Sequence, residues 1–321
     1  MKAVFLDYAT LDQQDLDHSE LAQQFSAFAL YPSTQPDEVL TRIQHADVVI
    51  SNKVVLDAGL IKQCPQLKLI LISATGTNNV DLEQARAQGI VVANCQGYGT
   101  SAVAQHTLAL MLALATSLPQ YQARIRQGAW SQSSQFCLLD FPIVELAGKT
   151  LGIVGYGTLG QAVARLARAF DMQVIVAALP HRSVHAQQNE RVPFDDFLAQ
   201  VDFLSLHCPL TTETKDLIDA KALSRMKNSA FLINCARGGI VNEADLATAL
   251  RQGQIAGAAL DVLSVEPPPA DHVLLAHDIP NLILTPHSAW GSVDARQRIL
   301  DQVLENAKAF QAGQALRVVN G

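Results

Sequence analysis

The chain has 321 residues, of which 49% are hydrophobic and 17% charged, and its net charge is −7 at pH 7. This length suits two domains, and the composition provides enough apolar residues for packed cores and excludes an intrinsically disordered protein. The negative charge disfavours nucleic acid or an anionic membrane as a partner. A small acidic substrate remains compatible with it, because local positive groups in a cleft decide such binding.

The N-terminal segment has neither the apolar length nor the small-residue cleavage site of a signal peptide. No apolar stretch approaches the roughly 18 residues of a membrane span, and the longest one, residues 107–115, predicts a buried helix. The five cysteines are scattered without a CxxC pair, so we expect buried, reduced thiols, a cytoplasmic location and no metal site.

The first 97 residues alternate short apolar segments with helical patterns. Strands are expected at residues 3–6, 48–50, 67–72 and 90–93, and helices at residues 36–45, 57–63 and 81–88. Alternation of this kind predicts a parallel sheet covered by helices.

A long apolar helix is expected over residues 102–118, with Thr100 or Ser101 as its N-cap and Pro119 as its end. Residues 120–146 are less regular. They predict surface loops or an arm that contacts another subunit.

The alternation restarts at residue 150. Strands are expected at residues 150–154, 173–177, 202–206, 230–234, 256–261 and 282–285, and helices at residues 159–170, 194–200, 220–226, 243–252 and 293–312. We predict an α/β protein with two Rossmann-like parallel-sheet domains. A dinucleotide-binding domain, residues 98–291, would be inserted into a flavodoxin-like substrate domain formed by residues 1–97 and 292–321.

The motif GYGTLG, which begins at Gly155, matches GxGxxG and lies between a predicted strand and a predicted helix. Gly155 permits the tight turn, Gly157 lets a pyrophosphate approach the backbone, and Gly160 lets helix and strand pack closely. Thr158 and Leu159 open the helix, whose N-terminal N–H groups attract the pyrophosphate. The motif predicts dinucleotide binding; a glycine-rich turn that binds nothing, or one that binds S-adenosylmethionine, is the alternative.

An acidic residue about 20 residues after this motif commonly binds the adenosine ribose. Here the strand ends at Ala178 without a carboxylate, so nothing there repels a 2′-phosphate. His181, Arg182 and Ser183 could bind that phosphate, unless Arg182 simply points to solvent. The cofactor is therefore expected to be NAD or NADP.

Reduction of a 2-oxo acid requires a hydride, which a nicotinamide supplies, a cation for the carboxylate and a proton donor for the carbonyl oxygen. Arg237 follows the expected strand 230–234 and can bind the carboxylate and polarise the carbonyl. His287 follows the strand 282–285 and can exchange a proton near neutral pH, with Glu266 as its partner. A structural ion pair and a structural histidine are the alternatives.

With these residues in this order, the chain resembles the D-isomer-specific 2-hydroxyacid dehydrogenases over nearly its whole length. The resemblance rests on GYGTLG, HCPLTTET (207–214), NCARGGIVNEADL (234–246), ALDVLSVEPP (259–268) and TPHSAW (285–290). Three further segments are similar to the bacterial glycerate dehydrogenase, or hydroxypyruvate reductase, branch: ATGTNNVDL (74–82), NCQGYGTSAVAQHTLALMLAL (94–114) and FCLLDFPIVELAGKTLGIVGYG (136–157). Formate dehydrogenase of the same superfamily carries glutamine where this chain has Glu266.

The resemblance implies catalytic roles for Arg237, Glu266 and His287, and a contact between Asp261 and the nicotinamide carboxamide. It also implies that five residues line the cofactor: His207, Cys208, Pro209, Cys235 and Ala236.

The substrate carboxylate is expected to bind residues 74–77, where backbone N–H groups around Thr75 and Gly76 can form an anion-binding nest. Lys53 follows an adjacent strand and either flanks the substrate pocket or is simply exposed. Trp290 either forms a wall of the pocket or packs at the hinge.

The predicted function is hydride transfer between NAD(P)H and a small 2-oxo acid, with hydroxypyruvate/D-glycerate or glyoxylate/glycolate as the expected pairs. One alternative is an NAD(H)-sensing corepressor or scaffold without significant turnover, and another is a different Rossmann enzyme such as a methyltransferase. The resemblance also implies a homodimer joined through the cofactor domain.

Overall fold

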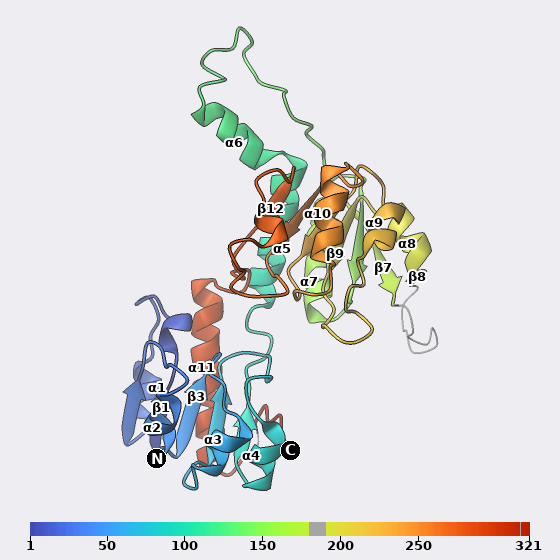
Figure 1. Cartoon of the computed structure of the whole chain (residues 1–321). Helices are drawn as coiled ribbons and strands as arrows, with labels where there is room; N and C mark the ends of the chain where they lie inside the picture. The colour runs from blue at the N-terminus through green and yellow to red at the C-terminus, as the bar shows by residue number, and fades with distance from the viewer. Residues whose placement is uncertain (180–190, 315) are drawn as a thin grey trace. The chain divides into compact units, whose positions relative to one another are not determined.

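The chain forms two compact units, each built on one sheet, in a computed structural model that describes residues 1–179, 191–314 and 316–321 (Figure 1). The first unit contains Met1–Gly99 and Trp290–Gly321, and the second contains Thr100–Ala289. All of the strand pairs are parallel within both sheets as described. The predicted α/β fold with two parallel-sheet domains is confirmed.

The sheet of the first unit has the order β2-β1-β3-β4-β5. Its strands are β1 (Lys2–Phe5), β2 (Ala27–Leu30), β3 (Val48–Ser51), β4 (Leu69–Ile72) and β5 (Val91–Ala93). The helices are α1 (Ser19–Gln23), α2 (Val39–Ile43), α3 (Ala58–Lys62), α4 (Leu82–Ala87) and α11 (Val293–Gln311), with the 3-10 helix η1 (Tyr8–Thr10). The order 2-1-3-4-5 is that of flavodoxin-like folds.

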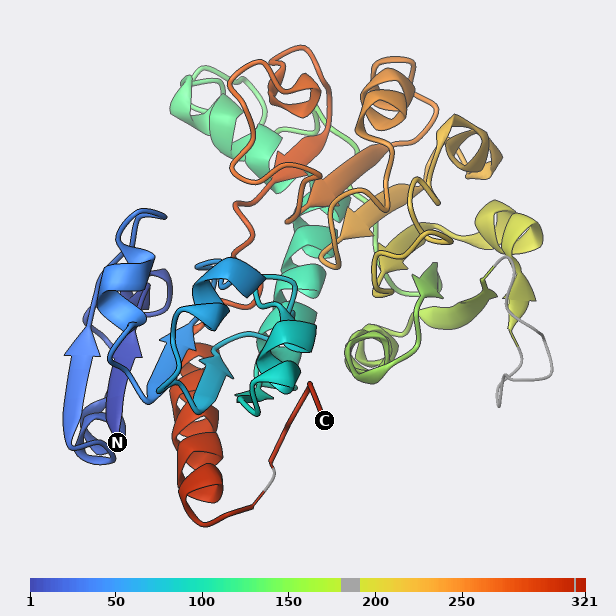
Figure 2. The same cartoon turned by 60° about the horizontal axis from the view of Figure 1, so that its bottom comes forward.

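Both faces of this sheet are buried. In β4, Leu69 and Leu71 pack in one cluster with Val303 of α11, whereas Ile70 packs in another cluster with Ile43 of α2 (Figure 2). Successive side chains of a strand point to opposite faces, so a strand covered on both sides needs an unbroken apolar run.

The sheet of the second unit has the order β12-β11-β10-β9-β6-β7-β8. Its strands are β6 (Thr150–Val154), β7 (Gln173–Ala178), β8 (Val192–Pro193), β9 (Phe203–Leu206), β10 (Phe231–Asn234), β11 (Gly257–Leu260) and β12 (Leu282–Leu284). The helices are α5 (Thr100–Ala115), α6 (Leu118–Arg126), α7 (Thr158–Ala169), α8 (Phe194–Gln200), α9 (Ala220–Arg225) and α10 (Glu243–Arg251), with the 3-10 helix η3 (Val273–Leu275). This is the Rossmann order with one added strand, and its switch point lies between β6 and β9.

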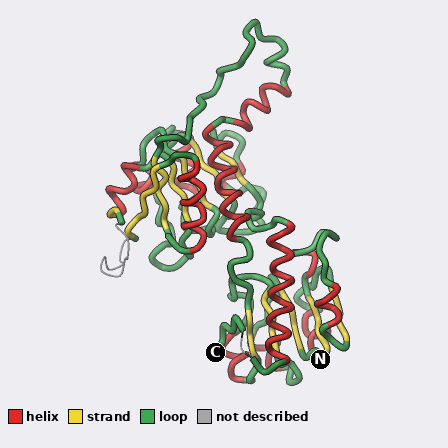
Figure 3. The backbone as a smooth tube through the Cα atoms, turned by 180° about the vertical axis from the view of Figure 1, so that it is seen from behind, coloured by secondary structure: helices red, strands yellow, loops and turns green. Residues whose placement is uncertain are grey.

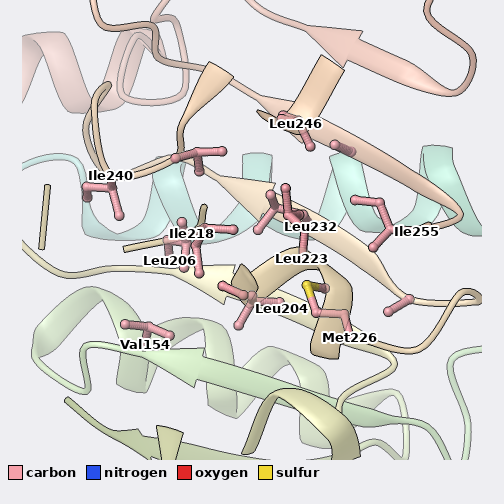
Figure 4. Packing of buried hydrophobic residues seen from close by; sticks show 14 of the residues in the cluster. Val154, Leu204, Leu206, Ile218, Leu223, Met226, Leu232, Ile240, Leu246 and Ile255 are labelled. Carbon is pink, nitrogen blue, oxygen red and sulfur yellow. The ribbon is translucent and has the colours of Figure 1, made fainter. Parts of the chain in front are cut away.

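The core of the second unit lies between this sheet and helices α8, α9 and α10. Leu206 of β9 and Leu232 of β10 pack there with Leu223 of α9 and Leu246 of α10 (Figure 4). This core fixes the positions of the strand ends from which the loops of the candidate site emerge.

The prediction that Pro119 ends a helix is wrong. Helix α5 ends at Ala115, and Pro119 lies in the first turn of α6. A proline is tolerated there because the N–H groups of a helix's first turn have no partner within the helix. Helix α6 and the irregular loop that follows it extend away from the rest of the second unit (Figure 3).

In the part of the chain that the structure describes, no single helix is long and apolar enough to cross a membrane. Helices α5 and α6 meet the length and composition requirement only as a pair, with a 60° bend between them.

Candidate active site

Three loops of the second unit follow the carboxyl ends of the neighbouring strands β10, β11 and β12. They carry Arg237, Glu266 and His287, respectively. The carboxyl ends of parallel strands meet at one edge of a sheet, which is where such folds bind ligands. A β-carbon added at Gly238 would lie 1.9 Å from the carbonyl oxygen of Leu263, so glycine is needed where the first loop packs on the second.

His287 and Glu266 form a hydrogen-bonded pair. His287 Nδ1 lies 2.6 Å from Glu266 Oε2, and Glu266 Oε1 accepts the N–H of Leu263 at 2.8 Å. An ionised carboxylate only accepts hydrogen bonds, so the shared hydrogen belongs to Nδ1. The pair can therefore orient the imidazole while Nε2 exchanges a proton with another group.

Asp261 holds the backbone on which His287 lies. The φ angle of His287 is 52°, in the left-handed region that few non-glycine residues adopt. Its N–H donates to the carbonyl oxygen of Asp261 at 2.8 Å, and the N–H groups of Ser288 and Ala289 donate to the Asp261 carboxylate, each at 2.9 Å. The surrounding hydrogen bonds thus maintain a conformation that is unfavourable by itself.

Arg237 lies on the loop after β10, and its side chain is exposed. Its Nη1 donates to the carbonyl oxygen of Ala236 at 2.7 Å, and buried Asn234 donates to the carbonyl oxygen of Arg237 at 2.9 Å. Among the described residues, no hydrogen bond or ion pair joins Arg237 to Glu266 or His287. The structure therefore pairs the glutamate with the histidine and places the arginine on the adjoining loop.

The loop between β6 and α7 has the shape of a phosphate-binding turn. Gly155 has a φ angle of 92°, and a β-carbon there would lie 2.6 Å from the backbone of His207. A β-carbon at Gly160 would lie 2.2 Å from the carbonyl oxygen of Gly155, whereas one at Gly157 would meet nothing within 4 Å. The loop is closely packed beneath and open above Gly157, the N-cap of α7, so it fits a dinucleotide pyrophosphate.

His207 follows β9, the strand next to β6 at the switch point. Its Nε2 lies 2.8 Å from Ser205 Oγ, and its Nδ1 is buried without a hydrogen-bond partner in the described part of the chain. Burial lowers the pKa of His207 to about 4, so the ring is neutral at pH 7. A buried, unpaired ring nitrogen beside the glycine loop is consistent with a ligand that supplies the missing bond.

The other residues expected to line the cofactor lie at the same strand ends. Cys208, Cys235 and Ala236 are buried, whereas Pro209 is exposed. Burial raises the pKa of the Cys208 thiol to about 11 and that of the Cys235 thiol to about 12. Neither thiol therefore forms the thiolate that nucleophilic catalysis at neutral pH would require.

In the first unit, the buried carboxylate of Asp7 holds the loop after β3. It accepts the N–H groups of Asn52, Lys53 and Val54 at 2.9, 2.6 and 3.2 Å. Because these three donors already bind Asp7, a substrate anion can be bound here only by a side chain. The side chain of Lys53 is exposed.

The loop after β4 is different. Thr75 Oγ1 donates to the carbonyl oxygen of Cys95 at 3.0 Å, and Asn94 donates to the carbonyl oxygen of Thr75 at 2.8 Å. Within the described first unit, no acceptor lies within hydrogen-bond distance of the backbone N–H groups of Thr75, Gly76 or Thr77. Such a loop has the donors that an anion-binding nest needs.

Trp290 is half-buried in the first unit. Its ring packs edge-on against that of Tyr98, with the centroids 6.3 Å apart. This contact gives the tryptophan a packing role.

At the end of β7, Ala178 is half-buried, and Arg191 Nη1 donates to the neighbouring carbonyl oxygen of Ala177 at 3.3 Å. The other expected phosphate-binding residues, His181, Arg182 and Ser183, lie outside the described residues.

Comparison with known proteins identifies the family. A profile of the D-isomer specific 2-hydroxyacid dehydrogenase, NAD binding domain, matches residues 108–289. Glycerate dehydrogenase of Methylorubrum extorquens is 43% identical over 319 residues, which cover 99% of this chain and 98% of that relative. The chain belongs to the D-isomer-specific 2-hydroxyacid dehydrogenase family. The predicted family and its glycerate dehydrogenase branch are confirmed, as is the assignment of the protein as a dehydrogenase that uses a nicotinamide dinucleotide.

Two further relatives agree along the whole chain. Hydroxypyruvate reductase of Blautia hydrogenotrophica is 35% identical over 323 residues, which cover 100% of both chains. The crystal structure of TT0316 protein from Thermus thermophilus superimposes with a TM-score of 0.86 at 33% identity, covering 99% of the dehydrogenase and 100% of that chain.

Sequence reasoning missed two carboxylates that hold loops of the candidate site. One is Asp7, and the other is Glu243, which accepts the N–H and Oγ–H of Ser264 at 2.7 and 2.6 Å. Glu243 also lies 3.0 Å from His272 Nε2. Asp7 could have been noticed from its position just after a strand, where a carboxylate can reach the loop of the next strand.

We expect the free energy of unfolding to decrease as the pH falls from about 6.5 towards 4, because burial lowers the pKa of His207 to about 4 from 6.5. Between these values the unfolded chain binds a proton that the folded chain does not bind, so the folded state is favoured at the higher pH. Urea unfolding at pH 7 and pH 5 measures the loss.

His207→Gln should show a smaller loss than the wild type over the same pH range. Asp15, whose pKa is lowered from 3.8 to about 2 mainly by a hydrogen bond from Arg296, affects stability only at lower pH. Equal losses in the wild type and the variant would show that His207 is not the source.

Proposed function

We propose that this dehydrogenase reduces a small 2-oxo acid with NAD(P)H, with hydroxypyruvate and glyoxylate as the expected substrates and D-glycerate and glycolate as the products. The decisive observation is the 2.6 Å contact between His287 Nδ1 and Glu266 Oε2, on loops that adjoin the loop of Arg237. The names of the relatives, glycerate dehydrogenase and hydroxypyruvate reductase, support this substrate class.

His287 is the proposed acid and base. Glu266 binds Nδ1–H, so Nε2 is the nitrogen that donates a proton to the carbonyl oxygen during reduction and accepts it during oxidation. The carboxylate also stabilises the positive charge that the ring carries when both nitrogens are protonated. The bound nicotinamide supplies or accepts the hydride.

Arg237 is the proposed cation for the substrate. Its guanidinium stays charged at any working pH, and its planar group can bind the carboxylate and polarise the adjacent carbonyl. We assign the backbone N–H groups of Thr75 and Gly76 to the carboxylate as well, and the side chains of Lys53 and Trp290 to the rest of the substrate. In this proposal, residues 1–97 and 292–321 form the substrate domain.

Residues 98–291 form the dinucleotide-binding domain in this proposal. Gly155, Gly157 and Gly160, with the N–H groups of Thr158 and Leu159, hold the pyrophosphate. The assigned cofactor wall consists of His207, Cys208, Pro209, Cys235 and Ala236. Asp261 is assigned to the nicotinamide carboxamide in addition to its role in holding the segment of His287.

We propose that NADP is accepted as well as NAD. The support is that Ala178, at the end of β7, carries no carboxylate that would repel a 2′-phosphate. The guanidinium of Arg191 lies beside it, hydrogen-bonded to Ala177, and its Nε is buried without a partner among the described residues.

Replacement of Ala178 should shift the cofactor preference. In Ala178→Asp, we expect kcat/KM for NADPH to fall by about tenfold or more, because two like charges in contact cost several kcal/mol. The value for NADH should stay level or rise. Ala178→Asn is the matched uncharged control, and an equal change for both cofactors in Ala178→Asp would contradict the proposed 2′-phosphate position.

The reaction is tested by initial rates of absorbance loss of NADPH and NADH with hydroxypyruvate, glyoxylate and pyruvate. We expect turnover with hydroxypyruvate or glyoxylate. Tight cofactor binding without turnover on any of the three would contradict the proposal and favour the NAD(H)-sensing alternative.

In the same assay, His287→Ala should lose roughly 10²–10⁴-fold in kcat, the usual contribution of a positioned acid or base. Glu266→Gln should lose less, because it removes the charge but keeps a hydrogen-bond acceptor. Cofactor affinity, measured by fluorescence titration, should stay near the wild-type value in both variants. Wild-type turnover by His287→Ala would remove His287 from the mechanism.

We also propose a homodimer joined through the second unit. Six large apolar side chains of α6 and the loop after it are exposed: Leu118, Ile125, Trp130, Phe136, Leu139 and Ile143. Phe136 is 90% exposed and Leu139 76%. A concentration of exposed apolar side chains on one extension is typical of a protein interface, and a second copy of this chain is the partner we assign to it.

Replacing two of these side chains should separate the dimer. Phe136→Ser combined with Leu139→Ser is expected to shift the mass measured by light scattering from that of a dimer towards that of a monomer. Phe170→Ser, which alters an exposed apolar residue outside the extension, is the control and should stay dimeric. A monomeric wild type would contradict the homodimer.

Finally, we propose a cytoplasmic location. All five cysteines are free thiols, which is what a reducing compartment maintains.

A further inference from the structure

Helix α5 carries a histidine, His106, that the proposed chemistry does not use. Its Nε2 lies 3.1 Å from Thr285 Oγ1 and 3.6 Å from Asp261 Oδ1. Thr285 Oγ1 in turn lies 2.5 Å from Asp261 Oδ1. We propose that His106 is a positioning residue for His287, acting through Thr285 and Asp261; this rests on the proposed role of His287.

The chemistry of the three groups sets the direction of the hydrogen bonds. The Asp261 carboxylate only accepts, so the single hydroxyl hydrogen of Thr285 is donated to it. Thr285 Oγ1 is then left as an acceptor towards His106, and the hydrogen of that bond must come from Nε2. The order is therefore His106 Nε2–H to Thr285 Oγ1–H to Asp261 Oδ1.

This chain of bonds ends on the group that shapes the backbone of His287. The side chain of Asp261 is 1% exposed, and besides Thr285 it accepts the N–H groups of Ser288 and Ala289. A buried carboxylate is strongly destabilised when it loses a donor. His106 holds the Thr285 hydroxyl in the orientation that supplies the third donor.

The position of His106 on α5 suits this role. The helix packs against β10 and β11, and its neighbouring side chains Val103, Leu108 and Leu110 are buried apolar groups. Packing of this kind keeps the helix fixed relative to the strand ends. His106, half-buried at 24% exposure, extends that rigidity to Thr285 through one hydrogen bond.

The first test compares variants that remove or keep the N–H donor. His106→Leu is of similar size without a donor, and we expect its kcat for the 2-oxo acid to fall about tenfold, within the range for a hydrogen bond to a charged network. The dissociation constant of NADH should change by less than about twofold, well under the tenfold that about 1.4 kcal/mol represents. His106→Gln places an amide N–H near the Nε2 position and should restore most of kcat.

Thr285 provides the second arm. Thr285→Val should lose kcat as His106→Leu does, and Thr285→Ser should retain it. Because the histidine acts through the hydroxyl, His106→Leu combined with Thr285→Val should lose no more than Thr285→Val alone. Additive losses, or equal losses in His106→Leu and His106→Gln, would overturn the proposal.

The third test does not depend on turnover. Hydrogen–deuterium exchange of the amides in residues 285–290 should be faster in His106→Leu and Thr285→Val than in the wild type, because the Asp261 carboxylate holds two of these N–H groups. Gln105→Leu, which changes the exposed neighbour on the same helix, should leave both exchange and kcat unchanged.

The outcomes separate the two proposals. A wild type that turns over none of the 2-oxo acids would overturn the proposed function, while exchange would still report on the hydrogen bonds. Unchanged exchange in His106→Leu, in a wild type that is active, would overturn the positioning role alone.

Discussion

The carboxylate of Asp261, at the carboxyl end of β11, determines the conformation of the segment that carries His287. It accepts two backbone N–H groups and one hydroxyl from that segment, while its carbonyl oxygen accepts the N–H of His287 itself. With Asp261 buried, these bonds cannot be exchanged cheaply for bonds to water. The left-handed backbone of His287 and its contact with Glu266 both depend on this group.

The first unit uses the same arrangement. Asp7 follows β1 and holds the loop after the adjacent strand β3, as Asp261 follows β11 and holds the segment after the adjacent strand β12. In a parallel sheet the loops of neighbouring strands start at the same edge, so a carboxylate on one strand can accept the unpaired N–H groups beyond the next. Two unrelated loops thereby become rigid supports for the side chains Lys53 and His287.

Much of the fold could be predicted, because most strands are covered on both faces and appear as short apolar runs. Strands β2 and β8 were not predicted. Both lie at sheet edges, where β2 is at best half-buried and β8 has only two residues, so neither needs such a run. The start of α6 at Leu118 was missed as well, because a proline is compatible with both the end of one helix and the first turn of another.

The sequence by itself determined the fold class, the glycine loop and the order of Arg237, Glu266 and His287, because local spacing and apolar patterns are written along the chain. Only the tertiary structure showed that Glu266 binds Nδ1 of His287, and that Asp261 and Thr285 connect His106 to the same segment. Contacts between residues 179 positions apart, such as that between His106 and Thr285, leave no local pattern, since they depend on which strands and helices become neighbours in space.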